Sequence, residues 1–465
     1  MISHQQKIQH LYLRAAFGEK PDIIQKKSRL AIEKNVDELF VNAQRYLSLK
    51  TMEDPIKSNG RPVSNLKILF MILRSKEETL KMNVDWLNMM SESASPLREK
   101  MTFFWHNHFA TSTPFAWLMQ VQNNTLRKNS LSSFRKLLHA VAKDPAMIIY
   151  LNNHQNKKDA PNENFAREVM ELFTLGEGNI YTEKDIKEAA RAFTGWTVNK
   201  KGEYEFEKED HDFGEKEFLG RKGNFNGEEI LDIILQQKQT ANHIASKIYK
   251  EFVNEEVDEE IVANLAEEFY TNDYDIKKLM EQIFVADWFY DEKNIGSKIS
   301  SPVELIVRYK KLINFDVKRD DGLFYMQRLL GQTLFFPPSV AGWKGGKNWI
   351  DSSSLFLRMN MPARILNDGG FDVRPKPEFE DVSDDTMLKT KKKASVQSDW
   401  NGLVRIFEKV KKEDLTQSVL DAFIQSPQTD IDKSIIEKYM DHSSDEKRII
   451  STCAAVFSLP EFQLI

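Results

Sequence analysis

The sequence predicts a mainly α-helical protein. We expect a multi-helix orthogonal array or bundle, with a long glycine-rich loop or small β-hairpin inserted and a small helical unit towards the C-terminal end. Apolar residues recur at the three- and four-residue spacing that one face of a helix requires, whereas long alternating strand patterns are scarce. With 465 residues, of which 41% are hydrophobic and 29% charged, the chain can bury a large core.

Several segments also carry the signals that begin and end helices. A side-chain cap followed by a first-turn proline or an acidic third residue predicts a helix start. Gly195 can adopt the left-handed conformation that ends a helix. The predicted starts are Asp144–Pro145, Thr182–Asp185 and Ser301 with Pro302 and Glu304.

The composition along the chain predicts three parts. Residues 1–368 form the main helical domain, in which the glycine-rich stretch 199–228 is a loop or hairpin excursion. Residues 369–400 are polar and aperiodic, which indicates a linker or surface excursion. Residues 401–465 again show helical periodicity, and we expect this C-terminal unit to pack on the main domain.

Charge and cysteine content exclude several classes of function. The chain has 65 basic and 70 acidic residues, so no basic field exists to attract nucleic acid. The single cysteine, Cys453, excludes an intramolecular disulfide and is expected to be a buried hydrophobe. No apolar run is long enough for a transmembrane segment. We expect a cytoplasmic protein as the sequence is written, or an exported one if a leader has been removed.

The segment LREKMTFFWHNHF places two histidines in an aromatic run. On a helix, Leu97, Met101, Phe104 and His108 share one apolar face, whereas His106 lies about 200° away. The two histidines therefore cannot bind one metal ion while the helix is intact, and the contiguous letters H-N-H do not make a nuclease. His108 is either a hydrogen-bonded core residue or a residue of a functional site.

The segment NENFAREVMELFTLG concentrates carboxylates and an arginine beside aromatic residues. On a helix, Glu163, Arg167 and Glu171 form a ladder of ion pairs, and Asn164 and Glu168 define the neighbouring stripe. This pattern fits either a solvated salt-bridge face or a cluster of catalytic or metal-binding carboxylates. The di-metal pattern is incomplete, because no histidine follows either glutamate at the three-residue spacing.

The segment EDHDFGEKEFLG places His211 and Asp212 in a turn-rich stretch. A histidine beside an aspartate can act as a general base with an oriented imidazole ring, but adjacency in sequence does not supply the geometry. The alternative is an Asx-type turn with an exposed histidine. We favour the turn.

The segment LFFPPSVAGWKGGKNWIDSSS combines prolines, glycines and two tryptophans. It is not a phosphate-binding loop, because Ala341 and Asn348 stand where that motif needs a glycine and a hydroxyl residue. Trp343 and Trp349 either stack on a bound sugar or peptide or fill the core of a rigid loop. The core alternative is favoured.

These segments, in this order, resemble a bacterial family catalogued as "domain of unknown function 1800", and the resemblance covers nearly the whole chain. Its W-x-N-H-F pattern points to Asn107 and His108. Its remaining patterns, N-E-N-x-A-R-E, T-G-W and H-D-x-G, fall on the segments that begin at Asn162, Thr194 and His211. The family has no established activity. The resemblance implies a protein partner from a sulfatase-like family of unknown function, and many relatives carry histidine where this chain has Phe173.

Two hypotheses of function follow. The favoured one is a non-catalytic partner or scaffold with a buried polar network and an aromatic, glycine-rich binding loop. The alternative is a hydrolase, with or without a divalent metal ion, whose pocket brings His108 and Glu168 within about 10 Å of each other in a hollow that water reaches. The catalytic candidates are His108, Glu163, Glu168, His211 and Asp212; the metal-ligand candidates are His108, Glu168 and Asp212; the binding candidates are Asn107, Asn164, Arg167, Arg191, Trp196, Trp343 and Trp349.

Overall fold

A computed structural model describes residues 2–55, 64–317, 322–366, 396–426 and 431–465. The fold is mainly helical with a few small two-stranded sheets, as the sequence predicts. Most of the polar stretch that we expected to be a linker, 369–400, lies outside the described residues.

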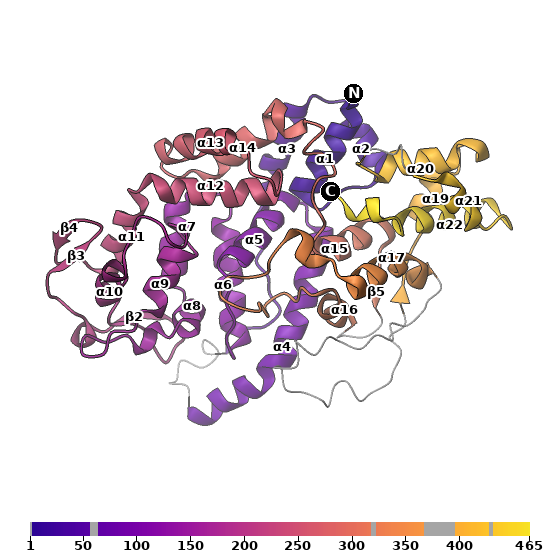
Figure 1. The fold of residues 1–465 in the computed structure, drawn as a ribbon. Helices are drawn as coiled ribbons and strands as arrows, with labels where there is room; N and C mark the ends of the chain where they lie inside the picture. Colours follow the sequence, from indigo (N-terminus) through magenta and orange to yellow (C-terminus); the bar gives the residue numbers. More distant parts are fainter. Residues whose placement is uncertain (1, 56–63, 318–321, 367–395, 427–430) are drawn as a thin grey trace.

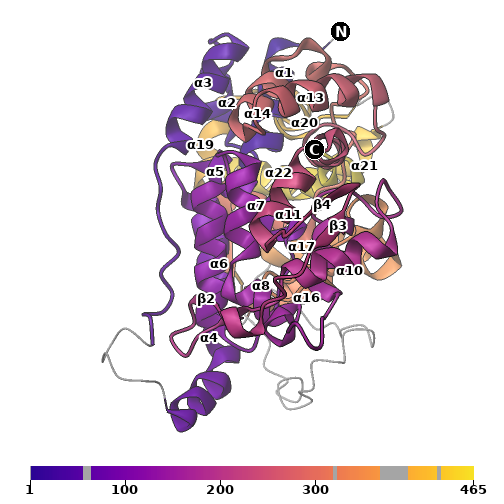
Figure 2. The same ribbon diagram turned by 90° about the vertical axis from the view of Figure 1, so that its left-hand side faces the viewer.

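The first half of the described chain is helical and carries every candidate motif up to the T-G-W segment. The long helix α4 runs down through the molecule, and its N-terminal end extends beyond the neighbouring elements (Figures 1 and 2). The helices are α1 (His4–Ala16), α2 (Pro21–Lys27), α3 (Ile32–Ala43), α4 (Asn65–Glu92), α5 (Pro96–His108), α6 (Ala116–Asn129), α7 (Phe134–Ala142), α8 (Pro145–Tyr150), α9 (Asn164–Glu171) and α10 (Glu183–Ala192).

Two short antiparallel hairpins follow α10, in the stretch where the sequence predicts a loop or hairpin. Strand β1 (Trp196–Val198) pairs with β2 (Tyr204–Phe206), and β3 (Lys216–Phe218) pairs with β4 (Arg221–Gly223). The H-D-x-G segment connects β2 to β3. With α10, these hairpins form one end of the molecule (Figure 1).

The second half is again helical. Strands β5 (Asp316–Val317) and β6 (Val396–Gln397) pair with each other. The helices are α11 (Gly227–Leu235), α12 (Lys238–Phe252), α13 (Glu259–Thr271), α14 (Ile276–Val285), α15 (Pro302–Ile313), α16 (Gly322–Leu330), α17 (Ser352–Leu366), α19 (Asn401–Phe407), α20 (Leu415–Phe423), α21 (Lys433–Lys438) and α22 (Asp445–Phe457).

Apolar side chains gather in two cores. One core combines α1, α3, α5 and α7–α14, and the other combines α4, α15–α17 and α19–α22. The C-terminal helices contact the rest of the chain directly, because α19 packs against α15 and α22 against α17. Cys453 lies fully buried in the second core. Helix α5 contributes to both cores, so its C-terminal end lies where the two meet.

The helix starts agree with the capping signals in the sequence. The Asp144 carboxylate accepts hydrogen bonds from the amides of Ala146 and Met147 at the start of α8. Thr182 with Asp185 and Ser301 with Glu304 form complete capping boxes at α10 and α15. The residues next to each helix start therefore determine where these three helices begin.

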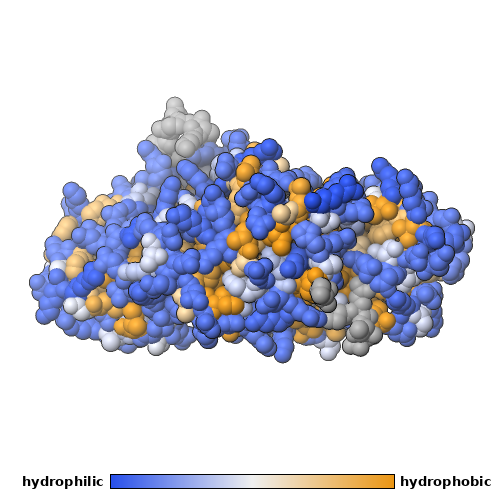
Figure 3. Space-filling model, turned by 90° about the horizontal axis from the view of Figure 1, so that it is seen from above, coloured by the Kyte–Doolittle hydropathy of each residue, from blue (hydrophilic) through white to orange (hydrophobic). Residues whose placement is uncertain are grey.

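The face of the molecule seen from above is mostly hydrophilic (Figure 3). Seen from above, hydrophobic patches are separated by polar and charged side chains (Figure 3). Within the described ranges, no helix combines the length and apolar content that a transmembrane span requires.

Candidate functional site

The H-N-H stretch forms the last turn of α5, and its first histidine faces the aromatic loop, which we define as residues 334–350. His106 Nε2 accepts a hydrogen bond of 3.2 Å from the backbone amide of Phe335. Its ring packs against Trp86 and Trp343. Burial, with a smaller contribution from Arg127, lowers the pKa of His106 to about 3. The imidazole is therefore neutral at physiological pH.

Asn107 holds the same loop at a second point. Its side-chain Oδ1 accepts a hydrogen bond of 2.8 Å from the amide of Trp343, and its Nδ2 donates to the Trp343 carbonyl at 3.4 Å. The approach is close because Gly342 has a φ of +74° and no side chain. A Cβ atom on Gly342 would overlap Asn107 Oδ1. The asparagine side chain thus binds both backbone polar groups of Trp343.

His108 faces the other way, as the helical spacing predicts. Its Nε2 lies 3.2 Å from the carbonyl oxygen of Phe173, and its Nδ1 lies 3.3 Å from Lys247 Nζ. It is 6% exposed and surrounded by the rings of Phe104, Trp105, Phe109, Phe134 and Phe173. Burial, followed by the charges of Lys247 and His243, keeps the pKa of His108 well below its usual value. His108 is therefore a neutral core histidine.

Two basic residues of α12 complete this arrangement. The carbonyl of Leu172, just after α9, accepts hydrogen bonds from Lys247 at 3.0 Å and from His243 at 3.3 Å. Basic side chains commonly bind the free carbonyls at the end of a helix. Burial lowers the pKa of Lys247 to about 8 and that of His243 to about 4. The group joins α5, α9 and α12 through backbone oxygens.

The predicted ion-pair ladder on α9 is present and is larger than the sequence indicates. Arg167 lies 3.3 Å from Glu163 and 3.1 Å from Glu171, and both of its terminal nitrogens also bind Glu183 at the start of α10. The Arg167 side chain is 31% exposed. The ladder is a partly solvated surface network that ties α9 to α10.

Glu168 is the motif carboxylate that this ladder leaves out. Burial and the nearby Glu171 raise its pKa above the usual value. Its backbone oxygen accepts the amide of Phe173, whose own carbonyl contacts His108. Glu168 is half-buried, whereas His108 is enclosed by rings. The water-accessible hollow that the hydrolase hypothesis expects around both residues is therefore not found at His108.

The H-D-x-G segment forms an Asx turn, as we favoured. The Asp212 carboxylate accepts the amide of Gly214 at 2.7 Å and forms two hydrogen bonds with Arg191, at 2.7 and 3.3 Å. His211 Nδ1 lies 2.8 Å from the carbonyl of Thr194. The expectation of an exposed histidine is wrong, because His211 is 3% exposed beneath Phe206 and Phe213.

The remaining binding candidates also make internal contacts. Asn164 donates to the carbonyl of Leu151 at 3.2 Å. The tryptophans Trp196, Trp343 and Trp349 are 3%, 6% and 7% exposed. Their indole faces pack inside the protein and do not present a stacking surface for a sugar or peptide.

The three metal-ligand candidates do not form one centre. Among the described residues, no group of three or more histidine, cysteine, aspartate or glutamate side chains is arranged to hold a metal ion. His108 lies among aromatic rings, Glu168 lies on α9, and Asp212 binds Arg191 in the hairpin region. These three side chains lie in separate surroundings in this structure, and their assignment as metal ligands stays a prediction.

An open groove lies elsewhere in the molecule. It has a volume of about 690 Å³ and lies between the N-terminal helices and the C-terminal unit. Lys20, Leu312, Arg405 and Phe407 are among its lining residues, and none of the candidates predicted from the sequence lines it.

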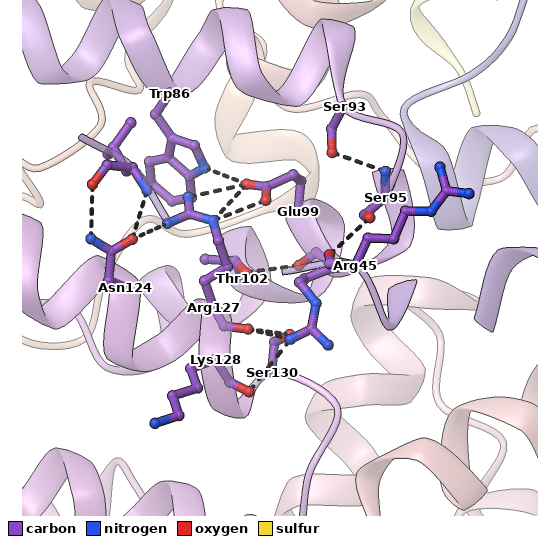
Figure 4. Close-up of polar contacts among 12 residues, drawn as sticks. Arg45, Trp86, Ser93, Ser95, Glu99, Thr102, Asn124, Arg127, Lys128 and Ser130 are labelled. Atoms are coloured by element: carbon purple, nitrogen blue, oxygen red, sulfur yellow. Dashed lines mark hydrogen bonds and ion pairs between the residues drawn. The ribbon is translucent and has the colours of Figure 1, made fainter. Parts of the chain in front are cut away.

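Sequence reasoning missed a buried ion pair beside α5. Arg127 binds the Glu99 carboxylate through Nε and Nη2, at 2.9 to 3.2 Å, and the indole of Trp86 donates to the same carboxylate at 2.9 Å (Figure 4). Arg127 is fully buried and Glu99 is 2% exposed. The signal in the sequence is weak, because Arg127 and Glu99 lie on different helices.

A second buried network lies one residue further along α5. Lys100 Nζ binds Glu304 and lies 3.5 Å from Glu251, whose carboxylate is 2.7 Å from Lys298. Burial alone would raise the pKa of Glu304, but Lys100 and Lys298 hold it below its usual range. Lys100 lies on the apolar face of α5, three residues after Leu97 and four before Phe104. A lysine on an apolar face needs a buried partner, and this was the signal in the sequence that could have predicted the network.

Together, these contacts define a class of protein: a helical protein whose polar motifs join distant segments through backbone hydrogen bonds and ion pairs. The chain belongs to the family described as "Protein of unknown function (DUF1800)", whose model matches residues 10–464. Neither a curated protein nor a solved structure matches the chain significantly.

Proposed function

We propose that the protein is a non-catalytic binding partner, a helical scaffold whose motif residues fix its shape. One observation carries the proposal: three consecutive side chains at the end of α5 each bind backbone atoms of a distant segment. His106 and Asn107 hold the aromatic loop at Phe335 and Trp343, and His108 contacts the Phe173 carbonyl. Side chains that satisfy buried backbone groups stabilise a structure and are costly to remove.

The charged candidates support the same proposal. A general base needs a lone pair that is directed at the proton it removes. Arg167 is shared by three carboxylates, Asp212 is held by Arg191 and Gly214, and His211 binds Thr194. These groups are committed to internal contacts.

The partner we propose is a protein of the sulfatase-like family of unknown function, which the family resemblance implies. Family membership over nearly the whole chain supports carrying this partner over as a proposal. A rigid scaffold suits such a role, because a pre-organised surface loses little conformational entropy on binding.

A hydrolase is the second candidate function, and among the predicted catalytic residues Glu168 is the one that supports it. This carboxylate is half-buried and has a raised pKa, and burial, followed by the charge of Glu168, raises the pKa of the nearby Tyr150. A carboxylic acid tuned in this way is suited to proton transfer. No hydrogen bond or ion pair of its side chain is recorded within the described part of the chain.

One pair of variants separates the two candidates in the native cell. Tagged Glu168→Gln or Asn107→Ala chains are expressed in a strain that lacks the native gene. After cross-linking and purification through the tag, the recovered sulfatase-like protein is quantified. Complementation of the deletion is measured in the same strains. The scaffold proposal expects Glu168→Gln to behave as the wild type and Asn107→Ala to lose stability and partner together.

Two outcomes would contradict the proposal. Loss of complementation in Glu168→Gln, with its melting temperature and partner recovery unchanged, would establish a catalytic role for that carboxylate. Failure of the wild-type chain to recover the sulfatase-like protein, with complementation intact, would refute the proposed partner.

A further inference from the structure

The first three turns of α4 carry the most concentrated group of exposed apolar side chains in the described part of the chain. Leu66, Leu69, Phe70 and Leu73 are 63%, 52%, 56% and 67% exposed, and Ile72 is 38% exposed. The first four follow the i, i+3, i+4, i+7 spacing, so they form one face. We name these four residues the α4 stripe.

The remainder of α4 shows that this face is unusual. Ser75, whose hydroxyl accepts the amide of Ala116 at 2.8 Å, is where the helix meets α6, and Met82 further along is fully buried. Between Ser75 and Met82 the outward positions include Glu77 and Lys81, both exposed. The same helix therefore has a charged outer face along the body and an apolar outer face at its projecting end.

Basic residues predominate beside the α4 stripe. Lys67, Arg74 and Lys76 lie within or next to it, and the first acidic residues of the helix follow at Glu77 and Glu78, of which Glu78 lies 3.9 Å from Arg74. Two copies of the chain paired through this face would bring these cations together, which disfavours self-association. Apolar side chains flanked by basic residues instead match a surface that is apolar beneath and negatively charged above.

We propose that the projecting end of α4 docks on the surface of an anionic lipid bilayer, an interaction that goes beyond the scaffold function proposed above. The stripe enters the boundary between head groups and acyl chains, and Lys67 and Arg74 pair with lipid phosphates. From Leu66 to Leu73 the helix is about 12 Å long, far shorter than the roughly 30 Å of a hydrocarbon core, so it lies in the interface and does not span it.

The position of this segment makes the contact sterically feasible. The N-terminal end of α4 extends past the other labelled elements in both perpendicular views (Figures 1 and 2). A flat membrane can therefore reach it before it meets the body. Both an apolar area and an electrostatic attraction are present, and peripheral membrane binding generally needs two such contributions.

Vesicle sedimentation tests the proposal with the full-length chain. The vesicles contain either 70% phosphatidylcholine with 30% phosphatidylglycerol or phosphatidylcholine alone. The variants are Phe70→Ser/Leu73→Ser and Lys67→Gln/Arg74→Gln. A control of similar exposure is Ile435→Ser/Tyr439→Ser, in and directly after α21 (Lys433–Lys438), which removes two apolar side chains that are 53% and 68% exposed and one helical turn apart. Thermal melting confirms that each variant is folded.

The wild type and the α21 control are expected to sediment with the anionic vesicles and not with the neutral ones. The partition coefficient should fall about tenfold or more in Phe70→Ser/Leu73→Ser, since about 1.4 kcal/mol of lost apolar burial corresponds to a factor of ten. It should fall in Lys67→Gln/Arg74→Gln and at high salt as well.

Three results would overturn the proposal. They are no sedimentation of the wild type, equal losses in the α4 and α21 variants, and a concentration-dependent dimer that depends on Phe70 and Leu73 without vesicle binding. The last result would assign the α4 stripe to a contact between two copies of the chain.

Discussion

Two arginines in this protein bind carboxylates in opposite surroundings. Arg127 and Glu99 form a fully enclosed pair between α5 and α6, with the Trp86 indole as a third partner. Arg167 binds three carboxylates on α9 and α10, but its side chain is 31% exposed. The sequence makes the Arg167 ladder conspicuous and conceals the Arg127 pair, yet we expect the loss of one partner to destabilise the protein more in the buried pair.

The difference follows from solvent. Water already solvates the charges of the Arg167 ladder, so pairing them changes the free energy little. Glu99 and Arg127 also have the neutral partners Trp86 and Asn124, but water cannot replace the countercharge inside the protein, so removing one charged partner leaves an uncompensated charge. The number of ion pairs in a motif is therefore a poor guide to its importance.

The largest effect is expected from breaking the buried pair. Arg127→Met should lower the free energy of unfolding by about 3–5 kcal/mol, because Glu99 then lies buried without its countercharge. Chemical denaturation measures this change. The double variant Glu99→Leu/Arg127→Met is the control and should recover part of the loss, and a loss in Arg127→Met below about 1 kcal/mol would contradict the argument.

A smaller effect is expected where the H-N-H stretch meets the aromatic loop. Gly342→Ala should destabilise the protein by about 1–3 kcal/mol, because the new Cβ would overlap Asn107 and the backbone has a positive φ. Gly345→Ala is the matched control, since Gly345 has a negative φ and nothing lies within 4 Å of its Cβ position. Equal melting temperatures of the two variants would refute the close approach.

The pH dependence of stability tests whether His106 is buried and neutral. The pKa of His106 falls from 6.5 to about 3 on folding, so below pH 6.5 the unfolded chain binds a proton that the native protein excludes. The contribution of the neutral His106 to the free energy of unfolding is therefore fully present above pH 6.5 and is lost as the pH falls towards 3. The stability difference between the wild type and His106→Gln should shrink over that range, whereas a constant difference would show that the imidazole is accessible to protons.

The smallest effect is expected at the surface ladder. Arg167→Ala should change the free energy of unfolding by about 1 kcal/mol or less, because the ion pairs are partly solvated. The same denaturation experiment in 0.5 M salt should reduce the change further. A loss as large as that of Arg127→Met would remove the distinction between the two regions.

Much of the fold follows from local chemistry in the sequence. The capping boxes at Thr182 and Ser301, the helical face of His108 and the ladder around Arg167 all depend on residues close in sequence, and the structure shows each of them. The buried partners could not be predicted, because Glu99 meets Arg127 and Lys100 meets Glu304 only through tertiary packing. The same limit explains the candidate metal site. His108, Glu168 and Asp212 have suitable donor atoms, but His108 lies among aromatic rings, Glu168 lies on α9 and Asp212 binds Arg191, and adjacency in sequence does not indicate these surroundings.

Hydrogen–deuterium exchange on Asn107→Ala tests the central claim, that the family motif at the end of α5 fixes the architecture. In the wild type the amide of Trp343 donates to Asn107. The account predicts that exchange across the aromatic loop, residues 334–350, becomes faster in the variant, while exchange in α9 and α10 does not change. Unchanged protection of the loop, together with loss of function in the cell, would contradict this claim. Asn107 would then be a residue of a catalytic or binding site.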